Sequence, residues 1–126
     1  MPGLHLTADC YRCRCDPAWL ADTQRLGQWC EQAVRGAGFE PLEQSFRGAA
    51  GEPRGPAGVT GAVLLEHGHV ALHTWPRRRM ATLDVFAGDC GDDQPARART
   101  LMTALVERFA PEWTEQRSLD RGDDET

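Results

Sequence analysis

Three histidines and a glutamate crowd into one short stretch, Glu66-His67-Gly68-His69 followed by His73. Imidazoles transfer protons near neutral pH, and two histidines with one residue between them are a known spacing of metal ligands. Glu66, His69 and His73 are therefore candidates for acid–base catalysis, and His67, His69 and His73 are candidates for a metal site. Hydrogen bonding explains these imidazoles more simply than a metal does, so we expect no bound metal.

Two apolar runs flank this stretch and predict a β-hairpin. Apart from His73, residues 62–65 and 70–75 are apolar or β-branched; Gly68 permits a tight reversal, and Pro76 ends the second run. Side chains alternate between the two faces of a strand. His69, His73 and Trp75 should therefore share one face, and the apolar residues between them should pack on the other.

The rest of the chain predicts three more strands and two helices. Strands are expected at 4–11, 39–46 and 80–86. One helix should start at Asp16-Pro17 and end near Gly36, and another should run from about 94 to 109. Together these elements favour an α+β fold, a two-layer sandwich whose mainly antiparallel sheet carries helices on one face. Residues 1–112 form this domain, and the charged residues 113–126 are expected to be a disordered tail. The Gly- and Pro-rich residues 47–57 predict a mobile loop, whose role the sequence leaves open.

Composition excludes several classes of function. The 126 residues suffice for one modest core, and the net charge of -5 disfavours nucleic acid as a partner. No apolar stretch reaches the length of a membrane span and no signal pattern opens the chain, so a cytoplasmic protein is expected. The cysteines lack the ligand spacing of a complete zinc site, and we expect free thiols at five positions, Cys10, Cys13, Cys15, Cys30 and Cys90.

Four motifs in consistent order resemble the prokaryotic S-adenosylmethionine decarboxylases, pyruvoyl enzymes of polyamine and spermidine synthesis. They are Gly3-Leu-His-Leu with Asp9 and Tyr11, then Gly58-Val-Thr-Gly, His69-Val-Ala-Leu-His-Thr-Trp-Pro and Leu83-Asp-Val-Phe. The resemblance implies a two-layer sandwich protomer, usually dimeric or higher. It also implies a chain that cleaves itself within the sequence Glu-Ser-His. The serine of that sequence becomes a pyruvoyl group, the electron sink for loss of carbon dioxide.

The chain departs from the family pattern where the chemistry takes place. Without a gap, His67 and Gly68 occupy the glutamate and serine positions of the cleavage site. Glycine has no hydroxyl, so neither the ester intermediate nor the pyruvoyl cofactor is expected to form. The family's catalytic cysteine corresponds to Gly88, and Cys90 could replace it only in a remodelled loop. Arg77 stands where the family has a glutamate.

Other positions of the family pattern are kept. His73 matches the processing histidine, and Trp75 lies in the same motif beside the substrate pocket. His5, Asp9 and Asp84 fall in the strand motifs and are taken as substrate-binding candidates. Phe46 is the candidate for the aromatic residue that stacks on adenine. The catalytic candidates of a still active enzyme are His73, His69, Glu66 and Cys90.

Three functions remain open from the sequence. The first is a non-processing homologue that binds S-adenosylmethionine or a related amine, as a regulator, a homodimer or a partner subunit. The second is an enzyme with changed chemistry on S-adenosylmethionine, a lyase or cyclising reaction that uses a histidine base or a metal. The third is ordinary decarboxylation by an unorthodox route. The first is favoured because no electron sink is visible in the chain.

Overall fold

The computed structural model describes residues 2–48, 57–89, 91 and 93–122. Its strands and helices follow in the order β1 (Gly3–Cys13), η1 (Pro17–Leu20), α1 (Thr23–Gly36), β2 (Pro41–Gly48), β3 (Val59–Leu65), β4 (Gly68–Trp75), η2 (Pro76–Arg78), β5 (Met80–Ala87), α2 (Gln94–Phe109) and β6 (Pro111–Arg121).

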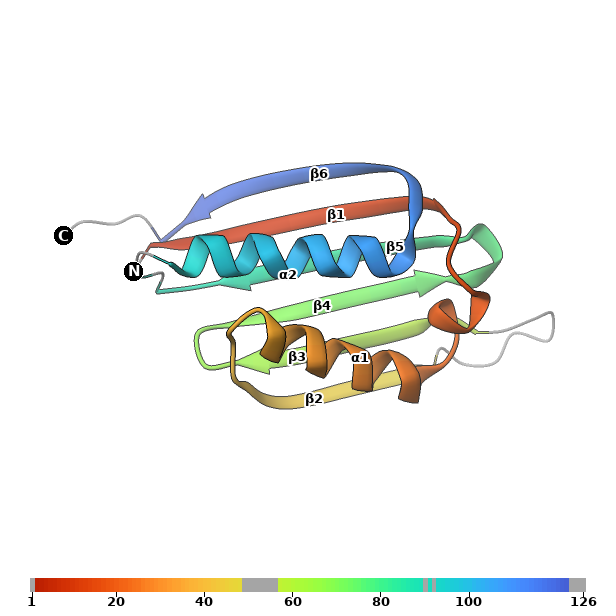
Figure 1. Ribbon diagram of the computed structural model, residues 1–126, viewed down its shortest axis with the longest axis horizontal. Coiled ribbons are helices and arrows are strands. Elements are labelled where there is room, and N and C mark those ends of the chain that lie inside the picture. Colours follow the sequence, from red (N-terminus) through yellow and green to blue (C-terminus); the bar gives the residue numbers. More distant parts are fainter. Residues whose placement is uncertain (1, 49–56, 90, 92, 123–126) are drawn as a thin grey trace.

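The strands form one six-stranded sheet in the order β2-β3-β4-β5-β1-β6, and every neighbouring pair is antiparallel. Both long helices lie on the same side of this sheet, α1 near β2 and β3, and α2 near β1 and β5 (Figure 1). The predicted α+β sandwich is confirmed. No helix of the described residues covers the second face of the sheet, and we call this face the open face.

The core lies between the helices and the sheet. It is formed by apolar residues at alternate positions of the strands and at every third or fourth position of the helices. In β4, Val70 and Leu72 are buried towards the helices, and the residues between them point outward. Helix α2, predicted at 94–109, covers this layer with a buried apolar stripe formed by Ala98, Leu101, Met102, Leu105 and Phe109. The predicted hairpin and its division into two faces are therefore confirmed. Within the described ranges no helix is long and apolar enough to cross a membrane.

The first helical region differs from its prediction. Asp16 does cap a helix, since its side chain accepts a hydrogen bond from the Ala18 amide at 2.9 Å, but that helix is the short η1. A second cap follows at Asp22, whose side chain accepts from the Arg25 amide at 3.0 Å and starts α1. Two consecutive capping aspartates divide what the apolar spacing predicted as one continuous helix.

The prediction of a disordered tail from residue 113 is wrong for residues 113–121. They belong to β6, which pairs with β1 from Gly3↔Arg121 to Cys13↔Pro111. Most side chains of β6 are exposed, so the strand lacks the alternation of apolar and polar residues by which a half-buried strand is predicted from sequence. Backbone hydrogen bonds to β1 hold it in place instead. Residues 123–126, and most of the predicted loop 47–57, lie outside the described part of the chain.

Candidate functional site on the open face

Most of the predicted site residues share the open face. Paired residues in an antiparallel sheet point to the same side, so the register defines rows across the strands. One row contains Leu64, His69, Phe86, His5 and Leu119. Two rows further along lie Thr60, His73, Thr82, Asp9 and Glu115. Asp84 lies in the row between them and Trp75 lies beyond His73, so six predicted residues are on one surface.

A ring cluster forms at the end of the open face near the β3–β4 turn. The ring centres of His5 and His69 lie 6.2 and 5.7 Å from that of Phe86. His5 Nε2 lies 3.1 Å from Asp84 Oδ1, which fixes the imidazole against a carboxylate. The guanidinium carbon of Arg121 lies 5.0 Å from the centre of the Phe86 ring, within cation–π distance. This cluster offers aromatic faces next to both a carboxylate and a cation.

A second group lies towards the other end of β4. Thr60 Oγ1 lies 3.1 Å from His73 Nδ1, so the hydroxyl orients the imidazole. The ring of His73 is 6.0 Å from that of Trp75, whose indole is 40% exposed. An exposed indole beside an oriented imidazole is a suitable surface for a flat or cationic ligand.

The three histidines of the possible metal site do not converge. His69 and His73 are four residues apart on one strand, about 13 Å at 3.3 Å per residue. His67 lies in the turn with Glu66, whose carboxylate is 3.8 Å from its Nε2. Among the described residues, no group of three or more His, Cys, Asp or Glu is placed to hold a metal ion.

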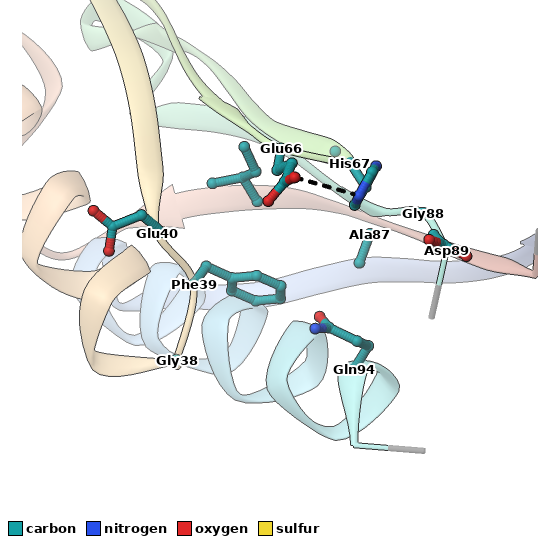
Figure 2. A pocket seen from close by; sticks show the side chains of 11 residues that line it. Gly38, Phe39, Glu40, Glu66, His67, Ala87, Gly88, Asp89 and Gln94 are labelled. Carbon is teal, nitrogen blue, oxygen red and sulfur yellow. Dashed lines mark ion pairs between the residues drawn. The ribbon is translucent and has the colours of Figure 1, made fainter. Parts of the chain in front are cut away.

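Gly68 and Gly88, which the sequence predicts to take the places of the family's serine and cysteine, lie together at the end of the sheet. Gly68 opens β4 and pairs with Ala87, the last residue of β5, and Gly88 follows directly. Both glycines border a cavity of about 140 Å³ between this end of the sheet and the helices. Figure 2 shows the Phe39 ring and Gln94 on one side of this cavity, and Glu66 with His67 on the other.

Two predicted residues are not part of this arrangement. Phe46 pairs with Gly61 on the helix side of the sheet and packs against Gly27 of α1, so its ring does not reach the open face. A stacking role beside Trp75 therefore has no support from its position. Cys90 lies outside the described residues, and the prediction that it replaces the family cysteine stays a prediction.

The cysteines of the described residues are buried in β1, just after it and in α1. Cys10, Cys13, Cys15 and Cys30 are free, as predicted. Burial raises the pKa of Cys10 and of Cys30 to about 12 and that of Cys13 to about 11, so all three stay protonated at neutral pH. They serve the core, and none of them extends the candidate site.

Sequence reasoning missed two members of the ring cluster. Phe86 was read as part of a motif without a role, although its place in a strand with Asp84 indicated a common face. Arg121 was assigned to a disordered tail, and its place over Phe86 follows from the pairing of β6 with β1, which no local pattern reveals.

Comparison with known proteins gives one consistent result. The family model of S-adenosylmethionine decarboxylase matches residues 4–122. An S-adenosylmethionine decarboxylase proenzyme of Hydrogenobaculum sp. (strain Y04AAS1) is 30% identical over 120 residues, 95% of this chain and 81% of that protein. The corresponding proenzyme of Pelotomaculum thermopropionicum is 32% identical over 120 residues, 95% of this chain and 86% of that protein. The crystal structure of the adenosylmethionine decarboxylase from Aquifex aeolicus matches with a TM-score of 0.82 at 30% identity, over 98% of this chain and 92% of that chain.

Proposed function

The chain belongs to the S-adenosylmethionine decarboxylase family, and we propose that it is a member that stays uncleaved and binds S-adenosylmethionine or a related amine. Its role would be that of a regulator or a partner subunit. The proposal rests on the prediction that Gly68 takes the position of the cleavage serine, and it is supported by the gathering of six predicted residues on one face. The relatives are named proenzymes, a word for precursors that must be converted.

No side chain at residue 68 can start the conversion. Scission in the family needs a hydroxyl that attacks the carbonyl of the preceding residue, here His67. The threonines on either side of the turn hold other bonds: Thr60 contacts His73, and Thr74 donates to the Leu20 carbonyl at 2.7 Å inside the core. Thr74 is also six residues from Gly68 along β4, about 20 Å of extended chain. We therefore propose that this protein forms no pyruvoyl group.

The open face supplies the chemistry that such a ligand needs. An adenine ring stacks on aromatic side chains, and a sulfonium or ammonium group is attracted to ring faces and carboxylates. Trp75 provides a ring at one end of this face and Phe86 provides one at the other end, while Asp9 and Asp84 provide charges in the rows between them. The net charge of -5 favours the approach of a cation.

The same face also supports a homodimer. Large apolar side chains are exposed there on both sides of the rings, with Leu64 at 47%, Trp75 at 40%, Trp113 at 48% and Leu119 at 60%. Exposed apolar patches of this kind mark interaction surfaces. A second copy of the chain is the partner we propose, and it would enclose the ligand between two sheets.

Calorimetric titration with S-adenosylmethionine tests the proposal. We expect saturable heat from the natural chain and no release of carbon dioxide from carboxyl-labelled ligand. Trp75→Ala should weaken binding by about 2- to 30-fold, the equivalent of a cation–π contact of 0.5–2 kcal/mol. Gln28→Ala, an exposed position on α1 on the opposite side of the sheet, is the control and should bind like the natural chain. Absence of heat at millimolar ligand, or release of carbon dioxide, would contradict the proposal.

A further inference from the structure

At the end of the β3–β4 hairpin, the main chain of β4 packs directly against the main chain of β5. The β4–β5 pairing runs from Trp75↔Met80 to Gly68↔Ala87, so Gly68 lies directly against β5. A Cβ atom at Gly68 would overlap the carbonyl oxygen of Phe86 and would lie 3.2 Å from the Ala87 Cα. These obstacles are main-chain atoms of a central strand, and they cannot rotate away as a side chain does.

Gly88 makes a second close main-chain contact at this end of the hairpin, with His67. Its amide donates a hydrogen bond to the His67 carbonyl at 2.7 Å. That carbonyl is the one a hydroxyl at residue 68 would attack. A Cβ at Gly88 would come within 2.6 Å of the same oxygen, so this position also requires glycine. Glycine at residue 68 thus permits the close approach of the β5 backbone, and glycine at residue 88 permits the approach of the His67 carbonyl.

We propose that the backbone arrangement of this protein itself prevents self-cleavage, and that a serine at residue 68 would not restore self-cleavage. This inference rests on the proposed function, since it concerns why the chain stays uncleaved. Strand β5 occupies the space of a side chain at residue 68, and a serine enters only if the pairing of Gly68 with Ala87 opens.

Two effects oppose each other at this carbonyl. The Gly88 amide, taken alone, would help an attacking hydroxyl, because a hydrogen-bond donor on the carbonyl oxygen stabilises the negative charge that develops there. The overlap at residue 68 decides the outcome, because the shift that makes room for Cβ separates the hairpin end from β5. That shift moves the His67 carbonyl away from the Gly88 amide, and the assistance is lost with it.

Three variants, Gly68→Ser, Gly68→Ala and Gly88→Ala, test the inference against one control. Gly68→Ser and Gly68→Ala should each lower the melting temperature by about 5 °C or more, as overpacking against a fixed backbone does. Intact mass should show Gly68→Ser as a single uncut chain. Gly36→Ser, where a Cβ meets nothing within 4 Å, is the matched control and should melt like the natural chain. Gly88→Ala supplies an independent variant and should lose stability like Gly68→Ala.

The outcomes separate this inference from the proposed function. Cleavage of Gly68→Ser between residues 67 and 68, or a melting temperature equal to that of the natural chain, would overturn the inference. Neither result would contradict ligand binding by the natural protein, because the titration measures that binding separately. Unfolding of Gly68→Ser while Gly36→Ser folds is the extreme form of the expected loss.

Discussion

His73 carries the binding hypothesis at the scale of single residues. Its imidazole is exposed and oriented by Thr60, so its removal should affect the ligand more than the fold. We expect His73→Ala to weaken S-adenosylmethionine binding by about 2- to 12-fold, the equivalent of one hydrogen bond of 0.5–1.5 kcal/mol. Calorimetry measures the affinity. Gln28→Ala, an exposed position on α1 across the sheet, is the control, and unchanged affinity of His73→Ala would show that the ligand lies elsewhere.

Which side chains share a face could be predicted, but which of them touch could not. The alternation of β4 placed His69, His73 and Trp75 together because a strand has a period of two residues. His5 and Asp84 were each proposed, yet their contact spans 79 positions and depends on strand register. Phe46 was misplaced because the sequence does not tell which face of β2 meets the helices, and an irregularity between Pro41 and Glu43 shifts the register there.

At the scale of elements, β6 shows why a polar segment can be essential. An edge strand gains its stability from main-chain hydrogen bonds, which do not depend on apolar side chains. Composition therefore predicted disorder where pairing with β1 imposes order. In contrast, the stripe of α2 was predictable because a helix that covers a sheet must bury one face.

Truncation tests the contribution of β6. A chain that ends at Ala110 leaves the long strand β1 with an unpaired edge and removes the stacking of Trp113 on Tyr11. We expect this chain to aggregate or to lose at least about 2 kcal/mol of unfolding free energy, as several ladder hydrogen bonds contribute. A chain that ends at Gly122 keeps β6 and is the control. Equal urea midpoints for the two truncated chains would refute the role given to β6.

The burial of Cys30 between α1 and the sheet should make the stability of the protein depend on pH in alkaline solution. Burial raises the pKa of Cys30 from 9.0 to about 12. Below pH 9 the thiol is protonated in both states, and its contribution to stability is complete. Between pH 9 and 12 the unfolded chain ionises and the folded chain does not, so this contribution falls by about 1 kcal/mol at pH 10.

Urea unfolding of the natural chain and Cys30→Ala at pH 7 and pH 10 measures this effect. The stability advantage of the natural chain over Cys30→Ala should shrink by about 1 kcal/mol at the higher pH. The variant removes only one sulfur atom from the core, so both proteins should fold. An equal advantage at both pH values would show that Cys30 does not titrate in this way.

On the scale of the whole molecule, we expect the open face to be the surface through which two copies of the chain associate. One side of the sheet is covered by α1 and α2 (Figure 1), and the other exposes Leu64 and Leu119 at its two flanks. Sedimentation of the natural chain at micromolar concentration should give a dimer. Leu64→Glu with Leu119→Glu should give a monomer, because two buried carboxylates would oppose association. Leu42→Glu, at the β2 irregularity, is the control, and a dimer that survives the double substitution would place the interface on another surface.

Intact mass of the purified natural chain tests the central claim most directly. If Gly68 abolishes processing, the spectrum contains one species of the full 13.9 kDa, and it stays unchanged after long incubation with S-adenosylmethionine. Two fragments divided between His67 and Gly68, the second with a blocked amino end, would contradict the account.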